Sequence, residues 1–215
     1  MGGARRGFFV SFEGGDGAGK SSQIGRLADH LRRKGRVVRV TREPGGSDGA
    51  EEIRKLLVSG AAERWSPMTE ALLMYAARAD HLDRVIRPAL ARGEAVISDR
   101  FADSTMAYQG YAGGLGPTTV AELHRLIVGG DDPDLTIILD LPTSVGLARA
   151  GGRVSTETRF ESKGSGFQEK VRQAFLQIAA DHPARCVVID ATQPEEKVFD
   201  DVAGAVEKAL KRTHG

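Results

Sequence analysis

The sequence contains very little cysteine. Among its 215 residues there is one cysteine, Cys186. One cysteine excludes a disulfide within the chain and a zinc site built from cysteine thiolates. Cys186 lies in the apolar run RCVVID, and we expect its side chain to be buried there as a small hydrophobic group.

The sequence also lacks a long hydrophobic run. No stretch approaches the roughly 20 apolar residues that a transmembrane helix requires. The first residues, MGGARRG, do not contain the apolar core of a signal peptide. We therefore expect a cytoplasmic protein that does not associate with membranes.

There is almost no excess of charge of either sign. The 30 lysines and arginines nearly balance the 29 acidic residues, which leaves a net charge of +1. A large basic surface for nucleic acid is therefore not expected. The length suits one domain spanning residues 1–215, and no internal repeat divides the chain.

What the sequence does contain is a regular alternation of strand-like and helical segments. Apolar runs occur at 8–13, 36–41, 94–99, 135–141 and 187–190, and helical periodicity at 21–35, 47–57, about 67–92, 117–129 and about 194–211. We expect Ser47 to be an N-cap and Pro88 to divide the longest helix. This alternation predicts an α/β fold with a five-stranded parallel sheet and helices on both faces.

One segment, about 149–166, interrupts the alternation. Its sequence, RAGGRVSTETRFESKGSG, is polar and rich in glycine and arginine. A plain linker explains the glycines but does not require the arginines. We interpret the segment as a mobile lid over an anionic site.

A glycine-rich turn follows the first strand. Residues 14–21, GGDGAGKS, fit the phosphate-loop pattern G-x-x-x-x-G-K-[ST]. Backbone N–H groups and the N-terminus of the following helix can surround phosphate oxygens, while Lys20 reaches the β- and γ-phosphates and Ser21 binds Mg²⁺. The alternative is a chance match in an ordinary strand-to-helix turn. We predict a nucleoside triphosphate site formed by Gly14, Gly15, Asp16, Gly17, Ala18, Gly19, Lys20, Ser21 and Ser22.

A phosphate loop does not by itself define the reaction. A GTPase needs an N-K-x-D string, which is absent, and a motor or transport ATPase usually belongs to a larger chain. A small-molecule kinase needs an acceptor pocket, an acceptor-binding helix and a lid that excludes water. The chain offers candidates for all three.

Acceptor candidates follow two of the predicted strands, at the sheet edge where open α/β sheets bind ligands. In SDRF (98–101), Asp99 can orient a metal-bound water and Arg100 can hold an acceptor phosphate. In TREPGG (41–46), Arg42 and Glu43 occupy the equivalent position after the second strand. Either sequence is also compatible with an ordinary solvated turn.

The predicted helix TEALLMYAARADHLDRVI carries Met74 and Arg78, which are four residues apart and share a face. A polarisable side chain beside a guanidinium suits a nucleobase. We expect most of the run Leu72, Leu73, Met74 and Tyr75 to belong to the core. The predicted loop at 104–116, STMAYQGYAGGLG, is a further candidate for contact with a base or sugar.

Six motifs lie in order along nearly the whole chain. They are FEGGDGAGKSSQ (12–23), TREPGG (41–46), ALLMYAARADH (71–81), ISDRFADSTMAYQG (97–110), PDLTIILDL (133–141) and IDATQP (189–194). Together they resemble the bacterial thymidylate kinase family. The resemblance implies a P-loop kinase fold, phosphorylation of dTMP to dTDP with ATP and Mg²⁺ in dTTP synthesis, and a homodimer.

The resemblance also implies roles for individual residues. Lys20 and Ser21 match the ATP and Mg²⁺ ligands, and Asp99 and Arg100 match an Asp-Arg pair at the phosphates. The matching acceptor-side residues are Asp16 at the sugar, Arg42 and Glu43 in the turn, Arg78 at thymine, and Thr105, Tyr108 and Gln109 on the loop that closes over the nucleoside.

The family has two patterns of catalytic arginine. In one pattern the phosphate loop carries the arginine, and in the other that position is glycine and the lid supplies the basic residues. The chain has Gly17 there, so it resembles the second pattern. Its lid contains Arg149, Arg153, Arg159 and Lys163, of which we expect Arg153 and Arg159 to act.

The chain departs from the family at one position of the base site. The family usually has phenylalanine four residues before the helix arginine, stacked on thymine, and this chain has Met74. Methionine contacts a base more loosely, and Tyr75 is an alternative stacking residue. Other possible reactions are a kinase for dUMP or for an unphosphorylated nucleoside, and a non-catalytic nucleotide switch.

Overall fold

The computed structural model describes residues 7–150, 159–160 and 163–214. Its centre is a parallel five-stranded sheet with the order β2-β3-β1-β4-β5. The strands are β1 (Phe8–Glu13), β2 (Val38–Arg42), β3 (Ala95–Asp99), β4 (Leu135–Asp140) and β5 (Cys186–Asp190). The predicted sheet is confirmed.

The register of the strands brings the predicted site residues to one edge of the sheet. Asp99 lies opposite Phe12 of β1 on one side and opposite Arg42 of β2 on the other. All three residues stand at the carboxyl ends of their strands. This edge therefore gathers the phosphate loop, the SDRF segment and the REPGG turn, as a ligand site of an open α/β sheet requires.

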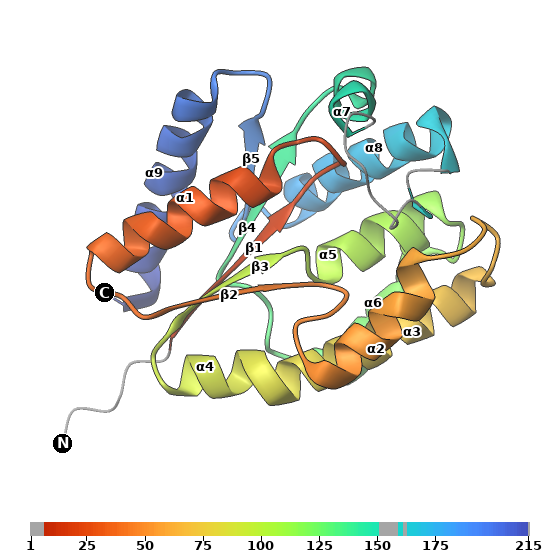
Figure 1. Ribbon diagram of the computed structural model, residues 1–215, viewed down its shortest axis with the longest axis horizontal. Helices are drawn as coiled ribbons and strands as arrows, with labels where there is room; N and C mark the ends of the chain where they lie inside the picture. The colour runs from red at the N-terminus through yellow and green to blue at the C-terminus, as the bar shows by residue number, and fades with distance from the viewer. Residues whose placement is uncertain (1–6, 151–158, 161–162, 215) are drawn as a thin grey trace.

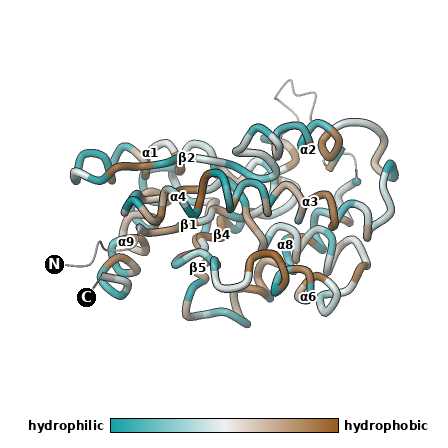
Figure 2. The backbone as a smooth tube through the Cα atoms, turned by 90° about the horizontal axis from the view of Figure 1, so that it is seen from below, coloured by the Kyte–Doolittle hydropathy of each residue, from teal (hydrophilic) through white to brown (hydrophobic). Residues whose placement is uncertain are grey.

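Helices cover both faces of the sheet (Figure 1). The chain forms α1 (Lys20–Arg33), α2 (Asp48–Val58), α3 (Pro67–His81), the π-helical η1 (Leu82–Ile86), α4 (Arg87–Ala91), α5 (Ala102–Thr105), the π-helical η2 (Met106–Ala112), α6 (Pro117–Ile127), α7 (Thr143–Ala150), α8 (Ser165–Asp181) and α9 (Glu195–His214). Figure 1 shows α1 and α9 on one face and α4 on the other. Hydrophobic and hydrophilic residues alternate along α2 (Figure 2), as expected for a helix with one buried face.

The core forms on both sides of β1. Phe8 packs in one cluster with Leu27 of α1 and Val202 of α9, whereas Phe9 points to the opposite face. There its ring meets Phe101 edge to face, with ring centroids 5.0 Å apart. A central strand buried on both faces explains why its sequence is almost continuously apolar.

Several local predictions need correction. The segment 104–116, predicted to be a loop, instead contains the end of α5 and all of η2. Helices α7 and α8 were not predicted, and they include both ends of the segment interpreted as the lid. The apolar stripe of α8, Val171, Phe175 and Ile178, is fully consistent with a helix. We did not predict this helix because the polar segment 149–166 precedes it and was interpreted as a lid.

Other predictions about single residues had mixed outcomes. Pro88 does lie in the first turn of α4, after the helix has been divided by η1. In the run 72–75, expected to lie mostly in the core, Tyr75 is buried and Leu72 is half exposed. Cys186 is buried as predicted, and burial raises the pKa of its thiol to about 12. No helix in the described residues is both long and apolar enough to cross a membrane.

Candidate active site

The phosphate loop connects β1 to α1, and the chain packs closely against it at Gly14 and Gly17. Gly14 has a φ of 125°, and a side chain there would meet the carbonyl oxygen of Leu139 at 2.4 Å. Gly17 has a φ of 78°, and its added Cβ would lie 2.2 Å from the carbonyl oxygen of Gly146. The loop therefore has no room for an arginine at position 17, so any such cation must come from another segment.

Lys20, the first residue of α1, folds back over the loop. Its Nζ donates hydrogen bonds to the carbonyl oxygens of Gly14 at 3.1 Å and Gly15 at 2.9 Å. The side chain is buried, and burial, followed by the nearby Arg100 guanidinium, lowers the pKa of Lys20 to about 8. An anionic ligand in the loop would oppose both effects and favour the ammonium.

Ser21 and Asp99 meet where α1 begins. The Ser21 hydroxyl donates to Asp99 Oδ2 at 3.3 Å. Hydroxyl and carboxylate oxygens are hard ligands of the kind that Mg²⁺ prefers. In the described part of the chain, three or more His, Cys, Asp or Glu residues nowhere gather as a metal site. This donor set fits a magnesium ion whose other ligands are phosphate oxygens and water. The neighbouring Ser22 hydroxyl instead donates to Glu195.

Arg100 has a distinctive backbone conformation. It is the one non-glycine residue in the described ranges with a positive φ, 68°. This conformation costs free energy and persists where surrounding contacts impose it. The guanidinium donates to the Gly14 carbonyl at 3.0 Å and pairs with Asp16 at 2.7 Å. It also lies over the ring of Tyr108, 5.2 Å from the centroid. Arg100 thus connects the phosphate loop to the acceptor side.

Glu13 holds the turn that carries Arg100. Its two carboxylate oxygens accept from the Phe101 backbone N–H at 2.7 Å and the Ser104 hydroxyl at 2.5 Å. Burial, followed by the charge of Asp103, raises the pKa of Glu13 to about 8. Our sequence interpretation missed Glu13. Its signal was a single acid at the end of an otherwise apolar strand.

The raised pKa of Glu13 predicts a pH-dependent stability. Between its ordinary pKa of about 4.5 and its folded value of about 8, the folded state holds a proton that the unfolded state has released. The free energy of unfolding therefore falls as pH rises through this window. Glu13→Gln does not titrate, so it is expected to lose this pH dependence. Between about pH 5 and about pH 8, its free energy of unfolding should therefore rise relative to that of the wild type by on the order of a few kcal/mol. Urea unfolding of both proteins at about pH 5 and about pH 8 measures the change, and a constant difference between them would contradict the prediction.

Arg78 presents one unpaired donor inside the protein. Its Nε donates to Glu43 at 2.8 Å and its Nη2 to the Thr105 hydroxyl at 3.0 Å. The remaining nitrogen, Nη1, is buried without a hydrogen-bond partner. Because a buried unpaired donor is costly, this nitrogen is suited to an acceptor on a ligand.

Glu43 lies behind Arg78 and orients it. Its other oxygen contacts Nδ1 of His81 at 2.9 Å, and Nε2 of His81 contacts the Thr41 hydroxyl at 2.7 Å. Both carboxylate oxygens of Glu43 are therefore occupied by protein groups. We predicted substrate contact for Glu43, and its observed contacts are those of a residue that positions Arg78.

Helix α3 and the α5–η2 segment face each other through two polar contacts. Arg78 contacts Thr105 at one end, and Glu70 accepts from the Gln109 amide nitrogen at 2.8 Å at the other. The half-buried Met74 lies on α3 between Glu70 and Arg78, four residues from each. Met74 and two buried atoms without hydrogen-bond partners, Arg78 Nη1 and Gln109 Oε1, therefore belong to the two elements that face each other here.

The comparisons with known proteins agree with this geometry. The sequence model of the family "Thymidylate kinase" matches residues 12–202, which is most of the chain. The chain belongs to the thymidylate kinase family.

Individual relatives support the same assignment. A thymidylate kinase of Caulobacter vibrioides is 58% identical over 205 residues, which covers 95% of this chain and 98% of that protein. One of Dinoroseobacter shibae is 55% identical over 196 residues, covering 91% and 94%. The crystal structure of thymidylate kinase from Ehrlichia chaffeensis superposes with a TM-score of 0.75 at 32% identity, covering 94% of this chain and 99% of that one. The family reaction is the ATP-dependent phosphorylation of dTMP to dTDP, as the sequence predicted.

Two further residues considered for a thymidylate kinase site, Tyr75 and Arg42, have protein partners in this structure. Tyr75 is buried, and its hydroxyl donates to the Val120 carbonyl at 3.2 Å, so it does not replace the stacking phenylalanine. The Arg42 side chain is half exposed and binds both oxygens of Glu51. It would have to leave this partner to reach a substrate phosphate.

The two lid arginines of the kinase pattern have different outcomes. Arg153 lies outside the described residues. Arg159 is fully buried, and its guanidinium donates to the carbonyl oxygens of Leu57, Ala61 and Ala62 at 2.9–3.2 Å. It also forms an ion pair with Glu70 at 2.5 Å. In this structure Arg159 therefore clamps the α2–α3 connection, and a catalytic role for it stays a prediction that requires these contacts to break.

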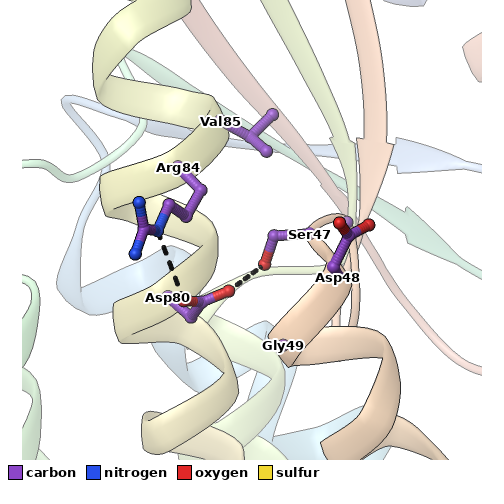
Figure 3. Close-up of a pocket in the computed structure, with 7 residues that line it drawn as sticks. Ser47, Asp48, Gly49, Asp80, Arg84 and Val85 are labelled. Atoms are coloured by element: carbon purple, nitrogen blue, oxygen red, sulfur yellow. Dashed lines mark hydrogen bonds and ion pairs between the residues drawn. The ribbon is translucent and has the colours of Figure 1, made fainter.

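A cavity of about 550 Å³ lies beside the N-terminus of α2, next to the REPGG turn. The predicted N-cap, Ser47, does occupy the N-cap position, but its hydroxyl donates to Asp80 at 2.6 Å (Figure 3). Arg84 pairs with the same carboxylate at 3.8 Å. The Ser47 side chain thus ties α2 to α3 in this kinase and does not cap the helix.

Proposed function

We propose that ATP binds on the phosphate loop of this thymidylate kinase and that the thymine of dTMP occupies the position between α3 and α5–η2. The single observation that carries the proposal is the pair of buried, unpaired atoms, Arg78 Nη1 and Gln109 Oε1. A thymine ring offers a carbonyl oxygen and an adjacent ring N–H, which complement one donor and one acceptor. Met74 supplies the apolar contact to the ring face.

The donor end of the site is supported by the enclosed loop. Backbone N–H groups from Gly14 to Gly19, the N-terminus of α1 and Lys20 provide positive potential for triphosphate oxygens. Ser21 and Asp99 would hold a magnesium ion, which supplies charge neutralisation to the phosphates when bound. The chain's own residues position the reactants.

The acceptor phosphate is assigned to Arg100. Its guanidinium donates to Gly14 and Asp16 of the phosphate loop and also lies over the ring of Tyr108 on the proposed acceptor side. Phosphoryl transfer depends on alignment and charge neutralisation more than on covalent catalysis. Arg100 can bind the acceptor oxygens and Asp16 can keep its guanidinium in line with the loop. Tyr108, whose ring lies under Arg100, closes the nucleoside side, and Arg42 and Arg153 remain proposed phosphate contacts.

A panel of acceptors tests this assignment. Purified protein with ATP and Mg²⁺ is expected to release ADP when dTMP is added, and much less with thymidine, because Arg100 then lacks its phosphate partner. ADP release without any acceptor would contradict the proposed acceptor site and indicate an ATPase. Equal rates with thymidine and dTMP would contradict the role of Arg100.

We also propose that the enzyme is a cytoplasmic homodimer, as the family resemblance implies. The face proposed for the dimer is an apolar ridge on α3, where Met68 is 41% and Leu72 50% exposed and the next residue at this spacing, Ala76, is also exposed. Such a ridge is stabilised by burial against a second copy. Sedimentation should give twice the chain mass for wild type and the single chain mass for Leu72→Glu.

A further inference from the structure

We propose that Glu70 is a positioning residue that fixes the amide orientation of Gln109 and thereby selects bases with a ring N–H. The proposal rests on the base contact assigned to Gln109 under the proposed function. Glu70 lies in the first turn of α3, is 3% exposed, and was not among the residues predicted for the site.

The orientation of Gln109 follows from the chemistry of its partner. A carboxylate paired with cations only accepts hydrogen bonds, so the amide of Gln109 must turn its nitrogen toward Glu70. The observed contact, 2.8 Å from Gln109 Nε2 to Glu70 Oε1, has this polarity. The amide oxygen then points away from Glu70, buried and without a protein partner. Glu70 therefore makes Gln109 an acceptor toward the base position.

Two cations support the charge of Glu70. Arg159 pairs with its Oε2 at 2.5 Å, and Lys163 lies 3.4 Å from its Oε1. Arg159 and Glu70 are both almost fully buried, and a buried carboxylate requires such partners. Arg159 and Lys163, from the arginine-rich segment 149–166, thus support the orientation of the amide at the base position through Glu70.

The expected consequence is discrimination by the edge of the base. Thymine and uracil present a carbonyl oxygen and a ring N–H, which match the Arg78 donor and the Gln109 acceptor. Cytosine presents an amino group and a ring nitrogen acceptor at the same places. The amino group would then face the Arg78 donor, and the ring nitrogen would face the Gln109 acceptor, so neither hydrogen bond can form. A Gln109 amide that is free to rotate would remove the second mismatch.

Glu70→Gln tests the proposal because its amide can face Gln109 with either oxygen or nitrogen. We expect the ratio of kcat/KM for dTMP over dCMP to fall by about tenfold or more. The ratio of kcat/KM for dTMP over dUMP should stay within about twofold of its wild-type value, because thymine and uracil present the same hydrogen-bonding edge. A purely structural defect would lower kcat/KM for dTMP, dCMP and dUMP by the same factor and leave the ratios unchanged. An unchanged dTMP/dCMP ratio would overturn the proposal.

Three variants make the result specific. Glu70→Asp keeps an acceptor-only carboxylate, so it should retain the wild-type dTMP/dCMP ratio even if kcat/KM falls, and loss of the ratio there would also overturn the proposal. This variant decides the question if Glu70→Gln does not fold. Lys163→Gln removes the more distant cation but leaves the closer Arg159 pair and the Gln109 contact of Glu70 in place, so it should retain the ratio. If Gln109→Leu keeps the wild-type ratio, the base contact itself fails, whereas a change in Gln109→Leu without one in Glu70→Gln rejects only the role of Glu70.

Discussion

Lys20→Ala is expected to lower kcat by about 10²- to 10³-fold while the protein remains folded. Lys20 is the one phosphate-loop side chain that folds across the loop, with its Nζ held by the Gly14 and Gly15 carbonyls. Negative charge on the transferred phosphoryl oxygens is stabilised by a cation in this position, and alanine removes it without replacing it. A coupled assay of ADP release at saturating dTMP measures the effect.

The control for Lys20 is a lysine at the opposite end of the same helix, α1, far from the loop. Lys34, the C-cap residue of α1, is half exposed and pairs with Glu207 on α9. Lys34→Ala should keep wild-type kcat. Circular dichroism should give the same helical signal for both variants. Turnover near the wild-type rate in Lys20→Ala would reject the assignment of the phosphate loop as the donor site.

Arg100→Ala is the second large effect, with kcat/KM for dTMP expected to fall by about 10³-fold. The loss has two physical parts. The acceptor phosphate loses its cation, and Asp16 loses the guanidinium that pairs with it at 2.7 Å, which leaves a carboxylate close to the phosphates. The KM for ATP should change less, since Lys20 and the loop amides remain.

Arg100→Gly separates catalysis from folding. Glycine adopts the positive φ of this position without strain, so the variant should stay folded while losing activity to the same extent as alanine. Arg84, whose side chain is 76% exposed, provides the matched arginine control, and Arg84→Ala should leave kcat/KM unchanged. A folded Arg100→Gly enzyme with wild-type kcat/KM for dTMP would contradict the role of Arg100.

The fold and the glycine-rich loop between β1 and α1 could be predicted because their signals are local. Apolar runs separated by helical periodicity indicate a parallel sheet, and GGDGAGKS combines the glycines and the lysine that a phosphate loop needs within eight consecutive residues. The family motifs in turn identified the reaction. These features are set by neighbours in the chain, so periodicity and spacing are sufficient to find them.

Some helices were missed because a local signal was misread. Glycine and polar residues made 104–116 look like a loop, although Ala107 and Tyr108 are buried against α8 in the folded chain. Tertiary packing overrides weak helix propensity in such a segment. Similarly, the arginines between 149 and 166 suggested a catalytic lid, while Arg159 satisfies backbone carbonyls of the α2–α3 connection.

The sequence by itself thus determined the fold class, the glycine-rich loop and the family, because each rests on local periodicity or on short motifs of consecutive residues. Only the tertiary structure decided which buried groups pair with one another. These pairs are Glu13 with Ser104, Glu43 with Arg78, and Glu70 with Gln109 and Arg159. Such pairs join residues far apart in sequence, and a carboxylate's partners depend on which helices pack together. Sequence spacing carries no record of that packing, so the residues that orient the site became visible only in the folded protein.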